Sequence, residues 1–109
     1  MSETRRAQPR WPLRRFVVAE ASMAPTLVAG QGVLATPYGP ATAGQLRVFE
    51  HPSRPGFWLV KRVEVVSAGS MIVASDNPAA EGATDSRTFG PVDVAGSLRV
   101  VARIPLRWM

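Results

Sequence analysis

The 109-residue sequence contains no cysteine and only one histidine, His51. Without thiols the chain forms no disulfide and no thiolate metal centre, and it has no cysteine nucleophile. A single histidine also excludes a histidine-rich metal site. We therefore expect neither a metal nor a cofactor in this protein.

The sequence also lacks any run of about 18 apolar residues, the length at which a segment is read as a membrane-spanning helix. Its N-terminus has no continuous apolar stretch of the kind found in signal peptides. We expect no transmembrane segment and a cytoplasmic location. A peripheral contact with a membrane surface is less favoured, and it would use the apolar residues Trp11, Leu13, Trp108 and Met109.

Positive charge is concentrated at the N-terminus. Residues 1–15 hold five arginines and one glutamate, whereas the whole chain has a net charge of only +5. With 46% hydrophobic residues, the chain is apolar enough to fold as one domain. We expect a flexible basic arm over residues 1–15 and a single domain over residues 16–109. Because the charge of that domain is nearly balanced, we expect no nucleic-acid partner for it.

Short apolar runs separated by glycine and proline predict a mainly β domain, built as a curled antiparallel sheet or a partly open barrel. The expected strands cover residues 16–19, 33–36, 45–50, 57–66, 71–74 and 97–104. Pro25 predicts a short helical turn after Ser22, because proline fits the first position of a helix. Residues 75–91 form a long polar loop, and a loop of this length in a small domain is usually functional.

Lys61 is the only lysine among 13 basic residues, and it lies in an unusual place. A period of two over residues 57–66 puts Lys61 on the same face as Phe57, Leu59, Val63 and Val65. A buried lysine loses its proton far more readily than an arginine does, so Lys61 is a candidate general base. In the alternative interpretation, the side chain runs along apolar surface and its ammonium group reaches solvent.

Three segments carry the motifs of the chain: residues 22–27 (S-M-A-P-T-L), residues 61–63 (K-R-V), and residues 76–77 (D-N) followed by residues 85–92 (D-S-R-T-F-G-P-V). In this order they resemble the type I signal peptidase family, and the resemblance covers roughly residues 16–105. It implies a signal-peptidase-like fold and a serine endopeptidase with a Ser22/Lys61 catalytic dyad. Ser22 is then the nucleophile, Lys61 is the base that activates it, and the backbone N–H of Ser22 is a donor to the oxyanion.

The resemblance also assigns roles to the residues around the dyad. Polar residues of the third motif are expected to brace the site: Asp76, Asn77, Asp85, Ser86 and Arg87. Among them, Asp85 and Arg87 suit a charge-assisted hydrogen-bonded pair. The substrate is expected to lie extended between the strand before Ser22 and the strand that carries Lys61. Four apolar residues are expected either to shape a small pocket for the residue before the cleaved bond or to belong to the core: Val18, Met23, Leu27 and Leu59.

Two positions depart from the family pattern. Glu20 stands where many members have a hydroxyl residue that completes the oxyanion hole, so the second oxyanion donor is not assigned. Ala83 stands where a small hydroxyl residue is often found. A hydrogen bond to the lysine is therefore either missing or supplied by Thr84 or Ser75.

The sequence lacks the membrane helices and the large inserted β subdomain of most family members. In this respect it is most similar to the soluble nickel-type superoxide dismutase maturation proteases. This similarity implies that the partner is a precursor protein and that the reaction is the removal of its N-terminal leader peptide.

Three alternatives remain open. His51 is a rival base, although it lies at a strand end beside Pro52. A self-cleaving domain of the SOS-repressor type shares the serine–lysine chemistry, but it needs a scissile Ala-Gly-like bond that residues 1–21 lack. The third alternative is not an enzyme: the chain would be a non-catalytic β module whose arginine-rich arm binds nucleic acid or another acidic partner.

Overall fold

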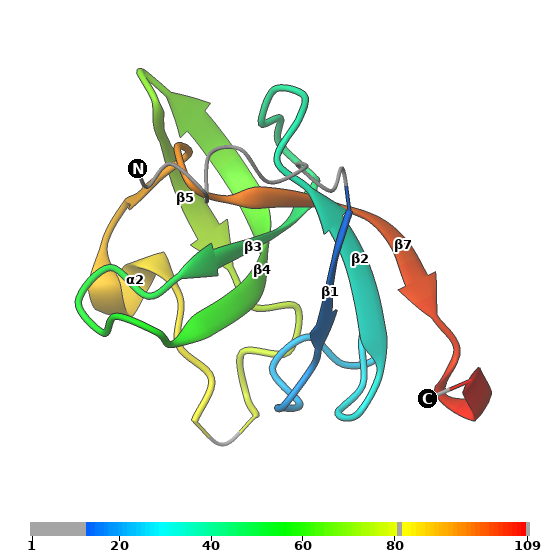
Figure 1. Cartoon of the computed structure of the whole chain (residues 1–109). Helices are drawn as coiled ribbons and strands as arrows, with labels where there is room; N and C mark the ends of the chain where they lie inside the picture. Colours follow the sequence, from blue (N-terminus) through cyan, green and yellow to red (C-terminus); the bar gives the residue numbers. More distant parts are fainter. Residues whose placement is uncertain (1–12, 81, 109) are drawn as a thin grey trace.

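The computed structural model of the chain describes residues 13–80 and 82–108. Within these residues seven strands form one antiparallel sheet in the order β1-β2-β7-β3-β4-β5-β6, which curls without closing into a barrel (Figure 1). The strands are β1 (Arg14–Val17), β2 (Gly32–Thr36), β3 (Leu46–Glu50), β4 (Trp58–Ser67), β5 (Ser70–Ala74), β6 (Val92–Asp93) and β7 (Leu98–Ile104). The short helix α2 (Ser86–Phe89) and the 3-10 turn η1 (Leu106–Trp108) accompany the sheet. The prediction of a mainly β domain with a curled antiparallel sheet is confirmed.

Six of the seven strands in this part of the chain fall where the sequence predicts them, with ends that differ by no more than two residues. The exception is β6, whose two residues pair with the start of β5 and are too few to show an alternating pattern. Arg14 and Arg15, which the prediction places in the arm, pair with Ala35 and Leu34 in β2. Residues 1–12, the rest of the expected arm, lie outside the described residues.

Strand β4 follows the predicted alternation only over its first half. Leu59, Lys61 and Val63 are buried, as expected for one face of a strand. After Val63 the register against β5 shifts at a bulge, and Val65 is 52% exposed. The prediction that Val65 shares the buried face is therefore wrong, because a bulge re-aims the side chains that follow it.

The buried apolar side chains form two clusters that involve different parts of the sheet. The first joins β2, β3 and β7 to the turn after Ser22, and its buried members are Val18, Met23, Leu27, Val33, Ala35, Val48 and Leu98. The second joins β3, β4, β5 and β6, and its buried members are Phe49, Leu59, Val63, Met71, Val73 and Val92. Successive strand residues point to opposite faces, so the membership of Val48 and Phe49 in different clusters means that both faces of β3 are covered.

The turn that carries Ser22 is anchored in the first cluster by Met23 and Leu27, whose side chains are fully buried. The N–H of Ala24 donates to the carbonyl of Ala21 at 3.0 Å, and the N–H of Leu27 donates to the carbonyl of Met23 at 2.9 Å. The second bond has the spacing of an α-helix, so the predicted helical turn is present as a single turn. The peptide bond between Ala24 and Pro25 is cis.

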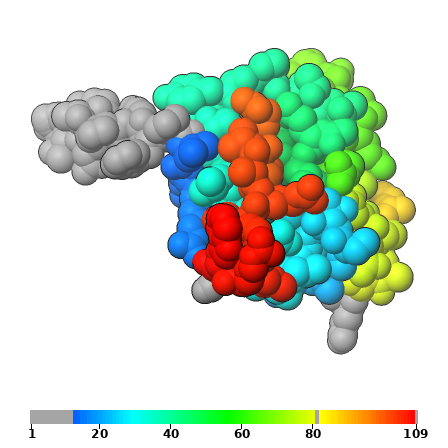
Figure 2. Space-filling view, turned by 90° about the vertical axis from the view of Figure 1, so that its right-hand side faces the viewer, coloured from blue at the N-terminus to red at the C-terminus, as the bar shows by residue number. Residues whose placement is uncertain are grey.

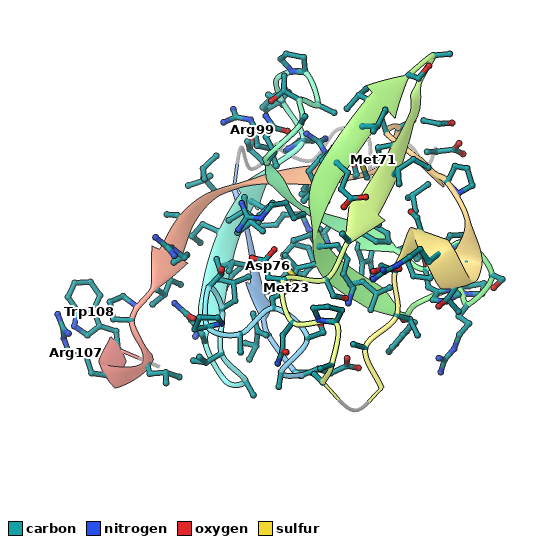
Figure 3. The ribbon with its side chains drawn as sticks, turned by 180° about the vertical axis from the view of Figure 1, so that it is seen from behind. Met23, Met71, Asp76, Arg99, Arg107 and Trp108 are labelled. Carbon is teal, nitrogen blue, oxygen red and sulfur yellow. The ribbon has the colours of Figure 1, made fainter. Side chains whose placement is uncertain are left out.

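On the face shown in Figure 2, β7 and η1 form an orange and red stripe between other segments of the chain. Arg107 and Trp108 lie at the end of this stripe and project away from the sheet (Figure 3). Leu13 and Trp108, considered above for peripheral membrane contact, are 44% and 71% exposed. Trp11 and Met109 lie outside the described residues. No helix in residues 13–80 and 82–108 has the length and apolarity needed to cross a membrane.

Candidate active site

Ser22 lies in the tight turn between β1 and β2, and its side chain is almost completely buried, at 6% exposure. The turn is held from the opposite side by Asn77. The backbone N–H of Asn77 donates to the carbonyl of Ser22 at 2.7 Å, and its Nδ2 donates to the carbonyl of Ala21 at 3.2 Å. Asn77 therefore fixes the backbone on which the Ser22 hydroxyl is mounted, as expected of a bracing residue.

Lys61 lies in the middle of β4 and is 1% exposed, so its ammonium group does not reach solvent. Its Nζ lies 3.0 Å from the Oγ of Ser22 and 2.9 Å from the Oγ of Ser75. Among the residues the structure describes, no carboxylate forms an ion pair with Lys61. The two side chains that the sequence predicts to meet are thus in hydrogen-bonding contact in a buried place.

The surroundings of Lys61 favour its neutral form. Burial lowers the pKa of Lys61 from its ordinary value, because a charged amine is poorly solvated there. The negative charges of Glu20 and Asp85 act in the opposite direction and raise this pKa, but they do not outweigh burial. At a given pH a larger fraction of this amine is therefore neutral than in an exposed lysine, and only the neutral amine can take a proton.

Ser75 supplies the hydrogen bond to the lysine that the sequence leaves open. The Ser75 hydroxyl donates to the carbonyl of Thr84 at 3.3 Å. Since a hydroxyl has only one hydrogen, Ser75 faces Lys61 as an acceptor and takes an N–H from the amine. Thr84 contributes its backbone to this chain of contacts and makes no direct bond to Lys61 among the described hydrogen bonds. In the sequence, Ser75 can be recognised by its position directly after the residues of β5 and directly before Asp76.

Asp76 connects the turn of Ser22 to the strand of Lys61. Its carboxylate accepts two hydrogen bonds from Arg62, from Nε at 3.0 Å and from Nη2 at 2.7 Å, and a third from the hydroxyl of Thr26 at 2.7 Å. The bonds from Arg62 are the main reason that the pKa of Asp76 is lowered. The N–H of Asp76 also donates to the Sδ of Met23, and the two residues lie side by side in Figure 3. The roles of Arg62 and Thr26 were not predicted from the sequence.

Asp85 and Arg87 form the predicted pair at the start of α2. Arg87 Nη2 donates to Asp85 Oδ2 at 3.0 Å, and the N–H of Arg87 donates to Asp85 Oδ1 at 3.0 Å, so Asp85 caps the helix. Burial alone would raise the pKa of Asp85, but hydrogen bonds from Arg87 and Ser75 together lower it. The hydroxyl of Ser86 accepts the N–H of Val73 at 2.9 Å and ties α2 to β5. These contacts fix the end of β5 and the residue after it, Ser75, whose N–H donates to Asp85.

A cavity of about 90 Å³ opens beside Ser22. This volume equals roughly three water molecules, so it fits a short side chain. Val18 and Leu59 line it as predicted, and further apolar residues that were not predicted complete its wall: Val33, Val48, Trp58 and Val60. Met23 and Leu27 do not line the cavity. Of the two roles expected for them, the structure gives both residues the core role, because the turn after Ser22 folds their side chains into the first cluster.

The backbone N–H of Ser22 donates to no acceptor within residues 13–80 and 82–108, so it is available to bind an oxyanion. Glu20 is exposed and lies at the rim of the cavity. Its carboxylate offers no hydrogen to an oxyanion when ionised. The described chain therefore leaves one backbone donor at Ser22 unbonded, and Glu20 has no hydroxyl that could add a second.

His51 is engaged away from the dyad. Its Nδ1 accepts the backbone N–H of Ser53 at 3.1 Å, and its ring lies against the rings of Phe57 and Phe89. The hydroxyl of Ser22 contacts Lys61 and not His51. His51 is therefore not placed to act as the base for Ser22.

No family model matches this chain, and no curated protein is significantly similar to it.

Proposed function

We propose that this protein is a serine endopeptidase in which Ser22 is the nucleophile and Lys61 is the general base. The observation that carries the proposal is the 3.0 Å contact between the Ser22 hydroxyl and the amine of a lysine that is 1% exposed and has no carboxylate partner in the described chain. A serine hydroxyl is a weak nucleophile until an adjacent base takes its proton. A lysine can be that base only when its pKa is lowered, which is what burial does here.

In the acylation step, the Ser22 Oγ attacks the carbonyl carbon of the scissile peptide while its proton passes to the neutral Lys61 Nζ. The carbonyl oxygen becomes an oxyanion and accepts the free N–H of Ser22. The C–N bond then breaks, and Lys61 gives the proton to the departing amine nitrogen. The products are an ester of Ser22 and a peptide with a new N-terminus.

In the deacylation step, Lys61 is neutral again and takes a proton from a water molecule. The resulting hydroxide attacks the ester carbon, and the proton returns from Lys61 to Ser22 Oγ as the ester bond breaks. Ser75 keeps one N–H of the amine engaged in both steps, so that the nitrogen lone pair points toward Ser22. Lys61 is thus acid and base in turn, as general acid–base catalysis requires.

The substrate lies extended between residues 16–20 and residues 57–60, which border the cavity on two sides. Backbone hydrogen bonds along these segments give affinity, and the cavity selects a short side chain next to the cleaved bond. The size of the cavity, about 90 Å³, is the support for this preference.

The resemblance of the motifs supports a narrower proposal, in which the substrate is a precursor protein and the product has lost its N-terminal leader peptide. The nickel-type superoxide dismutase precursor is the first substrate to test. This part of the proposal, with a cytoplasmic location, rests on the resemblance and not on the geometry of the site.

The test is incubation of the purified protein with a leader-bearing nickel-type superoxide dismutase precursor, followed by mass spectrometry of the N-terminus. We expect one cut with the unaltered protein and with the control Ser53→Ala, and none with Ser22→Ala or Lys61→Met. Lys61→Arg should also be inactive, because a guanidinium keeps its proton. A Lys61→Arg protein that cleaves at a near-normal rate contradicts the assignment of the base.

A second arm separates the chemistry from the substrate. A fluorophosphonate that labels active serines should modify Ser22 in the unaltered protein and fail to do so in Lys61→Met. Labelling without cleavage of the precursor rejects the substrate but keeps the dyad. The alternative of a nucleic-acid-binding arm concerns residues 1–15, of which residues 1–12 lie outside the described chain, and it stays a prediction.

A further inference from the structure

A second hollow lies apart from the dyad and shares no lining residue with the cavity beside Ser22. We name it the Arg47 groove, and it is lined by Arg14, residues 37–39, Arg47 and residues 94–98. Its volume is about 770 Å³, within the range of about 300–1,000 Å³ that is typical of small-molecule sites. The proposed peptidase chemistry makes no use of this groove.

Arg47 is the unusual residue of the groove. It lies in β3, and its side chain is 1% exposed. Its guanidinium donates from Nε to the hydroxyl of Ser97 at 2.8 Å, from Nη2 to the carbonyl of Ser97 at 3.3 Å, and from Nη1 to Oε1 of Gln45 at 3.1 Å. All three bonds end on neutral oxygens. A guanidinium has five N–H donors, so two of them have no acceptor in the described chain.

The positive charge of Arg47 is also uncompensated. No carboxylate pairs with it among residues 13–80 and 82–108, and none of the residues that line the groove is acidic. Burial and then the charge of Arg99 lower the pKa of Arg47, which shows that the surroundings oppose its charge. A buried ion without a counter-ion is costly in a folded protein.

Two more arginines lie at or near the groove. Arg99 lies opposite Arg47 in the register of β3 and β7, beside the loop that contains Tyr38 (Figure 3). Its Nε donates to the carbonyl of Tyr38 at 3.4 Å. Arg14 also lines the groove, and its guanidinium carbon is 5.1 Å from the centre of the Phe16 ring and 5.4 Å from the centre of the Trp58 ring, both of which line the cavity beside Ser22. Two arginines, Arg14 and Arg47, therefore line one hollow, Arg99 lies beside it, and none of its lining residues is acidic.

We propose that the Arg47 groove is a binding site for a small organic anion that carries a carboxylate or a phosphate group. The two free N–H groups of Arg47 receive the oxygens of that group, because a guanidinium fork matches a planar or tetrahedral oxyanion. Arg99 and Arg14 add positive charge around it. The groove is larger than a phosphate ion, and the rest of the ligand packs against Tyr38 and Leu98.

The test is thermal unfolding of the full chain at constant ionic strength, with sodium chloride replaced stepwise by sodium phosphate or by sodium acetate. A ligand that binds the folded state raises the Tm in a saturable way. We expect phosphate or acetate to do so and chloride not to. The arm that saturates at the lower concentration identifies phosphate or carboxylate as the preferred group.

Variants locate the effect. Arg99→Gln and Arg14→Gln should each weaken the apparent affinity several-fold, and Arg47→Gln should abolish the anion-dependent rise in Tm. Arg103→Gln is the matched control, since Arg103 lies on β7 outside the groove and the substitution removes the same charge. If Arg47→Gln does not fold, the other two variants still decide the question.

Three outcomes overturn the proposal. The first is an equal rise in Tm with chloride and with the oxyanions, which is a screening effect. The second is an equal response of Arg99→Gln, Arg14→Gln and the Arg103→Gln control. The third is the absence of any saturable rise, which leaves Arg47 as a structural tie between β3 and Ser97. None of these readouts depends on peptidase activity.

Discussion

Substitution Ser75→Ala separates the positioning of Lys61 from the chemistry that we propose for Lys61. It removes one buried hydroxyl that lies 2.9 Å from the amine, while Ser22 and Lys61 stay in place. A single hydrogen bond of this kind contributes about 1–2 kcal/mol. If that energy is lost in the transition state, the rate of acylation falls roughly 5- to 30-fold. KM should change little, because Ser75 does not line the cavity beside Ser22.

The same substitution should lower the pKa of Lys61 further. The hydroxyl of Ser75 accepts an N–H from the amine, and such a bond is stronger to the charged ammonium than to the neutral form. Loss of the acceptor therefore disfavours the charged form. A residue that only fills space would not shift this pKa in a defined direction.

The sequence provides a direct assay for this shift. Because Lys61 is the only lysine, labelling with ¹³Cε-lysine gives a single signal whose chemical shift titrates with pH. The unaltered protein should titrate below the ordinary lysine pKa of 10.5, since burial lowers that pKa. Ser75→Ala should titrate lower still, and its labelling by the fluorophosphonate should be slower. Ser70→Ala, at the other end of β5, is the matched control.

Two results would refute the reasoning. A pKa of Lys61 at or above 10.5 in the unaltered protein means that the amine is not desolvated as the structure indicates. A pKa and a labelling rate that are the same in Ser75→Ala and Ser70→Ala mean that Ser75 does not position the amine.

Further predictions concern stability and the cavity. The pKa of Lys61 is lower in the folded protein than its ordinary value of 10.5, so between these two values the unfolded protein binds more protons at Lys61. The free energy of unfolding should therefore rise with pH in that window. Measured by urea unfolding, this rise should be flatter in Lys61→Met. Asp76→Asn should cost about 1 kcal/mol at neutral pH, because the ion pair with Arg62 is partly exposed. The pKa of Asp76 is lowered in the folded protein, so the ionised carboxylate stabilises the fold fully above about pH 3.9, the ordinary aspartate pKa. This stabilisation is lost as the pH falls through the lowered pKa. The free energies of unfolding of Asp76→Asn and the unaltered protein should therefore become equal in acid. Val18→Phe should fill the cavity beside Ser22 and raise KM for leader cleavage more than it lowers kcat, and an unchanged KM would show that the cavity does not bind substrate.

The sequence predicts the features of this fold that depend on local pattern. The alternation of residues 57–63 is enough to place Lys61 on the buried face, because one side of a strand faces the core. It is not enough to place Val65, since the bulge depends on how β5 pairs with β4. Met23 and Leu27 are apolar in either role, and only the path of the turn decides between pocket and core.

The unpredicted parts of the site depend on contacts between distant residues. Arg62 and Thr26 meet at Asp76 although they are far apart along the chain. Arg47 is in the middle of an alternating strand, where an arginine is expected to face solvent. It is buried because both faces of β3 are covered, which the sequence of β3 alone does not reveal.

The contacts of Ser75 with Thr84 and Asp85 close the two ends of the loop over residues 76–84. Contacts at the ends of this loop therefore hold Ser75, the residue that bonds to Lys61. We expect an insertion after Pro78 to change the length of this loop while Ser22 and Lys61 keep their contact. A region so placed is open to variation between relatives and to the engineering of new substrate contacts next to an unchanged dyad.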